Sequence, residues 1–316
     1  MGVFYEYAAI SDRHKIGYEQ GQYCEEDFTS NSIAGKTLYS LISSGTEVFG
    51  CYDNPLNWNY PLRTGYSAVF EVEKVGSDVS SFKPGDRAFF WGNHSSYQLC
   101  QENEAVKIPN DLASETALFS RMATVSIATI EKTTIKPGAR VLVTGLGAVG
   151  LLAMQVYKNF GFETYGIDPY EPRVLLANKM GIKNVFTSCP ENLKKTFSLA
   201  LECSGSQQAT VSCLELIKNG GEISLVGVPW KKTGDIDAFL PLNLAFYNFA
   251  TVYSGWEVGI PDPLRIHHHK MAVEWLAEGK MTVEGMYEIR AREQIAQVYD
   301  EIYNKTTKSI STILKW

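Results

Sequence analysis

The feature that most constrains the fold is a glycine-rich turn between a predicted strand and a predicted helix. Residues 141–150 read VLVTGLGAVG, so strand-forming residues lead directly into Gly145-x-Gly147-x-x-Gly150, and 151–159 continue as an apolar helical pattern. Gly145 permits the tight turn, Gly147 lets the backbone approach a pyrophosphate, and Gly150 lets the helix pack close to the sheet. A glycine-rich turn in an unrelated βα unit is the alternative, but strand, glycines and helix together predict a dinucleotide-binding site.

The same segment predicts where the cofactor binds. The positive end of the helix, at Gly147, Ala148 and Val149, is expected to carry the phosphates on backbone N–H groups. A second predicted strand, 164–167, ends at Asp168, about 20 residues after the first glycine. We expect this carboxylate to bind the ribose hydroxyls of the adenosine.

The residues after Asp168 bear on the choice between NAD(H) and NADP(H). A carboxylate accepts hydrogen bonds from both ribose hydroxyls but repels a 2′-phosphate. The run from 168 to 173 reads DPYEPR, so Glu171 adds a second acid and Arg173 offers one cation. We expect NAD(H) to be favoured, with Arg173 on the adenine side and still able to meet a 2′-phosphate of NADP(H).

Composition excludes several other classes of function. The 316 residues carry a formal net charge of −6 and no long basic run, so nucleic acid is not an expected partner. No apolar stretch approaches the roughly 20 residues of a membrane span, and the N-terminus lacks a charged-then-apolar leader. We expect a cytoplasmic protein that acts on a small molecule, and the length suggests two domains.

The cysteines do not form a pattern typical of metal binding. The chain has 6 cysteines, scattered and without a Cys-x-x-Cys pair. In a reducing compartment such residues are most simply buried small apolar side chains. They also lack the close spacing of a structural zinc site.

The order of predicted elements divides the chain. Residues 1 to about 120 read as short strands separated by turns, such as 68–74 and 87–91. From 140 to 256, predicted strands and helices alternate, which indicates a parallel sheet with helices on both faces. Two predicted helices and a closing strand follow, in a tail too short to fold alone.

We therefore predict an α/β chain of two domains. A β-rich domain with a partly open barrel core comprises 1–121 and 257–316, and a doubly wound Rossmann domain comprises 122–256. The apolar strand 251–254 is expected at the edge of the Rossmann sheet, where an unpaired edge is a liability unless it is covered.

This order of elements resembles the medium-chain dehydrogenase/reductase superfamily over essentially the whole chain. The matching residues are KPGDRAFF (83–90), the glycine fingerprint, Glu202-Cys203-Ser204-Gly205 and SLVGVP (224–229). The resemblance implies a GroES-like fold for the β-rich domain and a homodimer that pairs two edge strands.

The resemblance also implies roles for individual residues. It places Thr124 against the nicotinamide, and Val226 and Val228 at the cofactor. The zinc-dependent members carry their three metal ligands in two turns and at the start of the helix before the fingerprint.

The metal ligands of that family are missing here. The first turn reads Ser44-Gly45-Thr46-Glu47, the second Gly65-Tyr66-Ser67, and the third place holds Ser120 and Arg121. Hydroxyls are poor zinc ligands at neutral pH, where zinc prefers thiolate, imidazole or carboxylate. We expect no bound zinc. Within the superfamily the chain looks most like the bacteriochlorophyllide dehydrogenase-type branch, although no residue indicates a tetrapyrrole substrate.

Without a metal, a side chain must protonate or stabilise the reacting oxygen. Tyr66 is the first candidate, because a phenol can donate to a carbonyl, although it could simply fill the space of the metal. Thr46 matches the hydroxyl that relays protons in zinc-dependent relatives, and His94 could exchange protons near neutrality unless it is a surface-loop histidine. Ser44 is a further candidate, and Glu47 is expected to pair with Arg63 or to hold its turn.

The run His267-His268-His269 is not a metal site, because consecutive helical residues point about 100° apart. We expect it to form a solvated face. Trp230 and Trp256 are expected either at the nicotinamide pocket or in the core.

Three functions are compatible with these residues. The first is an NAD(H)-dependent, zinc-independent oxidoreductase that transfers a hydride between nicotinamide and a secondary alcohol or ketone. The second is an NAD(P)H-dependent reductase of an activated C=C or C=N bond, and the third is a sensor of cofactor redox state. The polar cluster of Ser44, Thr46, Tyr66 and His94 favours the first.

Overall fold

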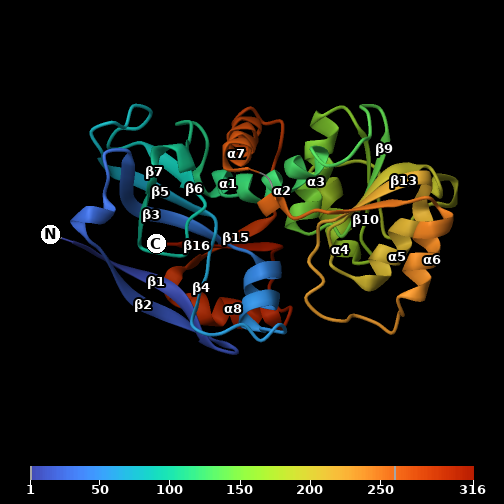
Figure 1. Cartoon of the computed structure of the whole chain (residues 1–316), viewed down its shortest axis with the longest axis horizontal. Coiled ribbons are helices and arrows are strands. Elements are labelled where there is room, and N and C mark those ends of the chain that lie inside the picture. Colours follow the sequence, from blue (N-terminus) through green and yellow to red (C-terminus); the bar gives the residue numbers. More distant parts are fainter. Residues whose placement is uncertain (1, 260) are drawn as a thin grey trace. The chain divides into compact units, whose positions relative to one another are not determined.

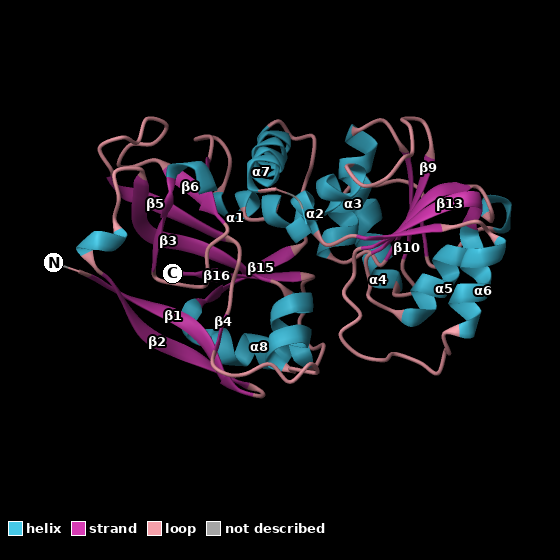
Figure 2. Ribbon diagram, in the orientation of Figure 1, coloured by secondary structure: helices cyan, strands magenta, loops and turns pink. Residues whose placement is uncertain are grey.

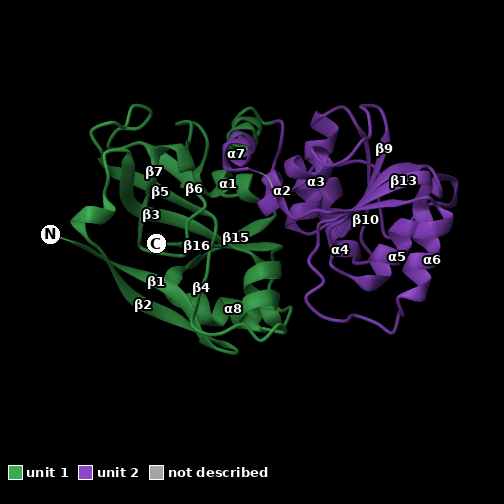
Figure 3. Cartoon of the chain, in the orientation of Figure 1, with its two compact units in different colours: residues 1–121, 269–279, 286–316 green, residues 122–268, 280–285 purple. Residues whose placement is uncertain are grey.

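The computed structural model describes residues 2–259 and 261–316 and forms two compact units (Figures 1 and 3). Unit 1 contains residues up to 121 together with 269–279 and 286–316, and unit 2 contains 122–268 and 280–285. The α/β fold class predicted from the sequence is confirmed.

The division differs from the expected one after residue 256. Residues 257–259, 261–268 and 280–285 cluster with unit 2 rather than with the β-rich unit 1. The segment 280–285 is held there because Gln155 Nε2 donates to the Thr282 carbonyl (3.1 Å) and Thr282 N–H donates to Gln155 Oε1 (2.7 Å). Such reciprocal side-chain contacts are not visible in a sequence pattern.

Unit 1 is built on a seven-stranded sheet of order β15-β16-β3-β5-β6-β8, with β7 also paired to β3. The strands are β3 (Ser32–Ile42), β5 (Ala68–Val75), β6 (Arg87–Phe90), β7 (Tyr97–Gln101), β8 (Ala105–Lys107), β15 (Tyr287–Ala291) and β16 (Ser311–Lys315). Its helical segments are η1 (Glu25–Asp27), η2 (Ser44–Tyr52), η3 (Glu102–Glu104), α1 (Ser114–Ala117), η6 (Arg292–Gln294) and α8 (Ile295–Tyr303).

A second, three-stranded sheet of order β2-β1-β4 completes unit 1. Its strands are β1 (Val3–Asp12), β2 (Lys15–Tyr23) and β4 (Leu62–Arg63). Ala8 and Ile10 of β1 pack in one buried cluster with Tyr52 and Tyr299. Each large apolar side chain buried in this way contributes about 1.5–3 kcal/mol, so the hairpin is part of the core of the unit.

Unit 2 contains a six-stranded, wholly parallel sheet of order β11-β10-β9-β12-β13-β14 (Figure 2). Its strands are β9 (Arg140–Thr144), β10 (Glu163–Ile167), β11 (Val185–Phe186), β12 (Phe197–Glu202), β13 (Ile217–Leu225) and β14 (Thr251–Ser254). Val141, Leu142 and Val143 are all fully buried, as expected for a strand covered on both faces. The prediction that 251–254 forms the edge strand is confirmed.

Helices flank this sheet (Figure 2). They are α2 (Ser120–Ile130), which starts in unit 1, α3 (Ala148–Asn159), α4 (Glu171–Lys179), α5 (Gln207–Leu216), α6 (Phe239–Tyr247) and the short η4 (Glu191–Leu193) and η5 (Glu257–Gly259). Helix α7 (Asp262–Ala277) contributes residues to both units. Across residues 2–259 and 261–316, no helix is long and apolar enough to cross a membrane.

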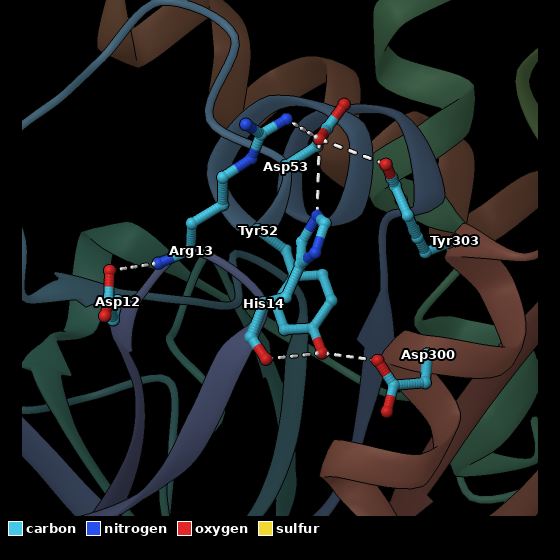
Figure 4. A network of polar contacts seen from close by, with 7 residues as sticks. All are labelled: Asp12, Arg13, His14, Tyr52, Asp53, Asp300 and Tyr303. Carbon is cyan, nitrogen blue, oxygen red and sulfur yellow. Dashed lines mark hydrogen bonds and ion pairs between the residues drawn. The ribbon is translucent and has the colours of Figure 1, made fainter.

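A polar network in unit 1 joins the β1–β2 turn to η2 and α8 (Figure 4). Asp53, at the end of η2, accepts from Arg13 Nη2 (2.7 Å) and from the Tyr303 hydroxyl (3.2 Å), and its Oδ1 lies 3.3 Å from His14 Nε2. The Tyr52 hydroxyl lies 2.6 Å from Asp300 Oδ1. These contacts fix the far end of η2, whose first residues are the candidate Ser44-Gly45-Thr46-Glu47 segment.

The Asp53 carboxylate should stabilise unit 1 in a pH-dependent way. Burial acts to raise the pKa of Asp53, but the hydrogen bonds from Arg13 and His14 outweigh it and lower the pKa. The stabilisation is therefore complete above the ordinary pKa of aspartate and is lost as the pH falls through the lower value of the folded protein.

We predict that Asp53→Asn reduces the free energy of unfolding by about 1–2 kcal/mol at pH 7. Urea unfolding should show this difference shrinking as the pH falls below the usual range of aspartate. The matched control is Asp12→Asn, since Asp12 is exposed and should cost less than about 0.5 kcal/mol. A difference that persists unchanged at low pH would contradict the role given to the carboxylate.

Candidate functional site

The glycine-rich turn of unit 2 lies at the carboxyl end of β9, where parallel sheets bind ligands. Gly145 has φ of +85°, which favours glycine, and a Cβ built on Gly150 would lie 1.9 Å from the Gly145 carbonyl oxygen. A Cβ built on Gly147 meets nothing within 4 Å. Gly145 and Gly150 are therefore required by packing, whereas Gly147 faces open space at the N-terminus of α3, as a phosphate-binding turn needs.

Two further glycines, Gly205 and Gly227, allow neighbouring loops to approach closely at the same edge of the sheet. A Cβ on Gly205 would lie 2.4 Å from the Val228 carbonyl oxygen, and one on Gly227 would lie 2.2 Å from the Gly205 nitrogen. The loops after β12 and β13 therefore touch backbone to backbone. Both glycines lie in motifs that the sequence showed, but the contact between them was not predicted.

Asp168 follows β10 and turns toward the glycine-rich loop. Its Oδ2 accepts from the Leu146 N–H (2.9 Å), and its Oδ1 accepts from the Tyr170 N–H (2.9 Å). The Arg173 guanidinium donates to Oδ2 at 3.1 Å, and the aspartate side chain is 4% exposed. Asp168 thus ties the second strand to the fingerprint, and Arg173 is held beside it.

Glu202 ends β12 and holds the next loop. Its carboxylate accepts from the N–H groups of Ser204 (2.7 Å) and Gly205 (2.9 Å). Burial raises the pKa of this carboxyl, and these hydrogen bonds partly oppose the effect. The cofactor candidate Val226 is the first residue after β13. Its N–H donates to the Glu202 carbonyl at 2.8 Å, which places it beside the end of β12.

The other two cofactor candidates differ in exposure. Val228 is 45% exposed, whereas Thr124, in α2, is fully buried. Trp256 is 66% exposed and Trp230 is partly exposed, so neither is ordinary core.

In unit 1 the candidate catalytic residues gather at one end of the large sheet. Strands β3, β5 and β6 are antiparallel neighbours, with Ser40 opposite Ala68 and Ala68 opposite Phe90. The end of β3, the start of β5 and the end of β6 therefore meet. The segment after β3 is not the simple turn expected but η2, a nine-residue π-helix, a conformation frequent at functional sites.

Glu47 is the buried centre of this end of the unit. Its carboxylate, 2% exposed, accepts from the Ser43 N–H (2.8 Å) and from the Tyr299 hydroxyl (2.6 Å), and His94 Nε2 lies 2.8 Å away. Of the two expected roles, the one in its own turn is confirmed by the Ser43 contact, whereas Arg63 is not the partner, since its guanidinium stacks 3.9 Å from the centre of the Tyr7 ring. The carboxylate instead joins η2, the loop after β6 and α8.

His94 is fully buried, which corrects the interpretation as a surface-loop residue. Its Nδ1 lies 2.8 Å from Ser40 Oγ, which accepts from Trp316 Nε1 at 2.8 Å. His94 Nδ1 therefore faces the Ser40 hydroxyl, and Nε2 faces the Glu47 carboxylate. His94 touches Glu47 rather than an exposed surface, so it could influence a substrate only through that carboxylate.

Tyr66 lies partly exposed among charged and hydroxyl groups. The Arg121 guanidinium lies 4.7 Å from the centre of its ring. Burial raises the pKa of the Tyr66 phenol, the Arg121 charge lowers it, and the Glu47 carboxylate raises it. Hydrogen bonds from Ser43 and Thr46 act on the same phenol, so the structure brings Tyr66 and Thr46 together, with Ser44 adjacent in η2.

The histidine run is not the solvated face that was expected. His267 is exposed, but His268 and His269 are each 1% exposed. His268 Nε2 lies 3.4 Å from Glu131 Oε1, and the His269 ring packs 5.1 Å from Phe89. Successive helical side chains point about 100° apart, so a helix packed on one side buries part of any run of three.

The residues at the three family ligand positions do not fit a zinc ion. They are the hydroxyls of Ser44, Tyr66 and Ser120, which are poor zinc ligands, and the guanidinium of Arg121, which is a permanent cation and cannot coordinate a metal. Throughout residues 2–259 and 261–316, there is no group of three or more His, Cys, Asp and Glu side chains that could hold a metal ion.

Comparison with known proteins supports the dehydrogenase resemblance. Residues 148–262 match the family described as Zinc-binding dehydrogenase. The chain is 26% identical to sorbitol dehydrogenase of Bacillus subtilis (62% of this chain, 66% of the relative). It is 28% identical to L-threonine 3-dehydrogenase of Marinomonas sp. (55% and 62%). The aligned part thus spans less than two thirds of either relative.

The fold has close counterparts among solved structures. Galactitol-1-phosphate dehydrogenase from Escherichia coli superposes with a TM-score of 0.82 over 98% of this chain and 100% of that chain, at 18% identity. Such similarity establishes a Rossmann sheet joined to a GroES-like, β-rich unit.

The two glycines of the fingerprint give a matched pair of predictions. Gly147→Ala should leave the melting temperature within about 1 °C of wild type, because its Cβ meets open space. It should weaken the binding of a dinucleotide, because the Cβ fills the approach to the α3 N-terminus.

Gly150→Ala should instead lower stability by at least about 2 kcal/mol, because its Cβ would overlap the Gly145 carbonyl. Thermal unfolding and calorimetric titration with NADH separate the two effects. Equal loss of stability in both variants would contradict the assignment.

Proposed function

We propose that this chain is an NAD(H)-dependent, zinc-independent oxidoreductase that transfers a hydride between nicotinamide and a secondary alcohol or ketone. The observation that carries the proposal is the open space at Gly147 beside a buried aspartate at the end of the next strand. This arrangement suits a dinucleotide with unphosphorylated ribose. The alcohol dehydrogenases among the relatives support the substrate class.

The residues of unit 2 would hold the cofactor. Backbone N–H groups of Gly147, Ala148 and Val149 would bind the pyrophosphate, Asp168 the ribose hydroxyls, and Arg173 would flank the adenine. Once bound, nicotinamide supplies or accepts the hydride.

The residues of unit 1 would handle the proton. Tyr66 is the proposed donor to the substrate oxygen, and Thr46 the neighbouring hydroxyl that orients it. A metal is not required for this chemistry, because a phenol held by hydrogen bonds and a nearby cation can stabilise a developing alkoxide. This donor set also favours reduction of a carbonyl over reduction of a C=C or C=N bond, which needs no strong proton relay.

Asp168→Ser tests the cofactor assignment. A charge-assisted hydrogen bond is worth about 1.5–3 kcal/mol, so NAD(H) affinity should fall about ten- to a hundredfold. NADP(H) affinity should rise, because like-charge repulsion is removed and Arg173 is free to meet the phosphate. Calorimetric titration of both cofactors measures the two effects.

Glu171→Ser is the matched control, since Glu171 is an exposed acid in the same segment and should leave the preference unchanged. A wild type that prefers NADP(H), or an Asp168→Ser variant with unaltered preference, would show that the ribose assignment is wrong.

We also propose that two chains associate through the edge of the unit 2 sheet. Strand β14 ends the sheet, and Val252, Trp256 and Val258 are 47%, 66% and 45% exposed. An uncovered apolar edge invites pairing with a second strand.

Light scattering at micromolar concentration should show a dimer for the wild type and a monomer for Val252→Lys. Phe4→Lys, which changes an apolar side chain that is 74% exposed in unit 1, should remain dimeric. A monomeric wild type would rule out the proposed association.

A further inference from the structure

Arg121 places a permanent positive charge inside unit 1. It lies at the start of α2 and is 5% exposed. Its guanidinium lies 4.1 Å from the centre of the Trp91 ring and 4.7 Å from that of the Tyr66 ring. The ring quadrupole attracts a desolvated cation that lies over an aromatic face, so these contacts hold Arg121 and both rings in one arrangement.

The arrangement follows from the fold of the unit. Tyr66 precedes β5 and Trp91 follows β6, so the antiparallel pairing of these strands brings them together, with ring centres 6.2 Å apart. The Trp91 ring in turn packs edge-on against His269 at 6.3 Å. Tyr66, which is partly exposed, thus lies beside a fixed cation and the Trp91 ring.

Two opposite charges act on Tyr66 in the described part of the chain. Arg121 from α2 favours the phenolate, and Glu47 from η2 favours the protonated phenol. Glu47 has its own partners in Ser43, His94 and Tyr299, which disperse its charge. Among the described groups that lower the pKa of the phenol, Arg121 acts most strongly, ahead of the hydrogen bonds from Ser43 and Thr46, so Arg121 is the group that most favours proton release from Tyr66.

We propose that Arg121 is a positioning residue for Tyr66: its stacked guanidinium orients the phenol and stabilises the phenolate that remains after proton donation. This inference rests on the proposed function and deepens it. In the zinc-dependent relatives, a metal ligand lies at this part of the chain, and the metal provides a positive charge. Here Arg121 would provide that charge.

In the proposed reduction of a carbonyl, the proton comes from Tyr66 and the electron pair comes from the hydride. As a hydride reaches the carbonyl carbon, the electron pair of the C=O π bond moves to the oxygen, and the Tyr66 O–H bond breaks to protonate it. The tyrosinate is held beside Arg121 until it regains a proton from solvent. Alcohol oxidation follows the same steps in reverse.

The test measures the acidity of the phenol directly, without turnover. In full-length protein, 3,5-difluorotyrosine at position 66 ionises in an accessible pH range, and fluorine NMR follows its titration. Arg121→Met should weaken its acidity about ten- to a hundredfold, whereas Arg121→Lys should largely preserve it. If Arg121→Met does not fold, Arg121→Gln, neutral and planar, provides the same comparison.

Arg63→Met is the matched control, because Arg63 stacks on Tyr7 in the same unit and should leave the titration at position 66 unchanged. Identical titration curves for wild type and the neutral Arg121 variants overturn the proposal. In the unlabelled enzyme, Arg121→Met should lower kcat and move its pH profile upward while KM for NADH stays constant, and Arg121→Lys should restore activity.

The outcomes separate this inference from the proposed function. A changed acidity with unchanged kcat overturns the role of Arg121 in the reaction. A changed acidity in a protein that turns over no alcohol or ketone supports the Arg121–Tyr66 pair and counts against the dehydrogenase function.

Discussion

The buried carboxylate of Glu47 holds together the end of unit 1 that contains Tyr66. A carboxyl side chain that is 2% exposed is tolerated only when its oxygens are hydrogen-bonded. Its partners Ser43, His94 and Tyr299 come from three separate segments. Ser40 and Trp316 extend the network to the last strand. Satisfying one carboxylate therefore fixes η2, the loop after β6 and α8 relative to one another, and with them the environment of Tyr66.

The two units bring their candidate site residues together by different structural means. In unit 2, glycines at 145, 150, 205 and 227 bring backbones closer than any side chain would allow, and the space left at Gly147 suits a phosphate. In unit 1, antiparallel strand ends bring together a phenol, hydroxyls and a guanidinium. The first arrangement suits the proposed binding of an anion through backbone dipoles, and the second suits the proposed donation of a proton beside a permanent charge.

Sequence patterns predicted unit 2 well because its signals are local. The fingerprint, the alternation of strands and helices, and the edge strand 251–254 each depend on contiguous residues, and all are found in the structure. The features that were missed depend on distant partners. Burial of His94, for example, requires Glu47 and Ser40, and the stacking of Arg121 on Trp91 joins residues from different elements. The family resemblance implied a turn at Ser44–Glu47, whereas the structure forms the π-helix η2 there.

The proposed hydride transfer needs no metal, and a deuterium label distinguishes it from a zinc-dependent reaction. Protein shown by elemental analysis to be free of zinc is incubated with 4-deuterated NADH and a set of ketones, and mass spectrometry locates the label. The account predicts deuterium on the carbonyl carbon at a rate that added zinc leaves unchanged and that Tyr66→Phe lowers at least about a hundredfold. Transfer that occurs only after zinc is added would contradict it.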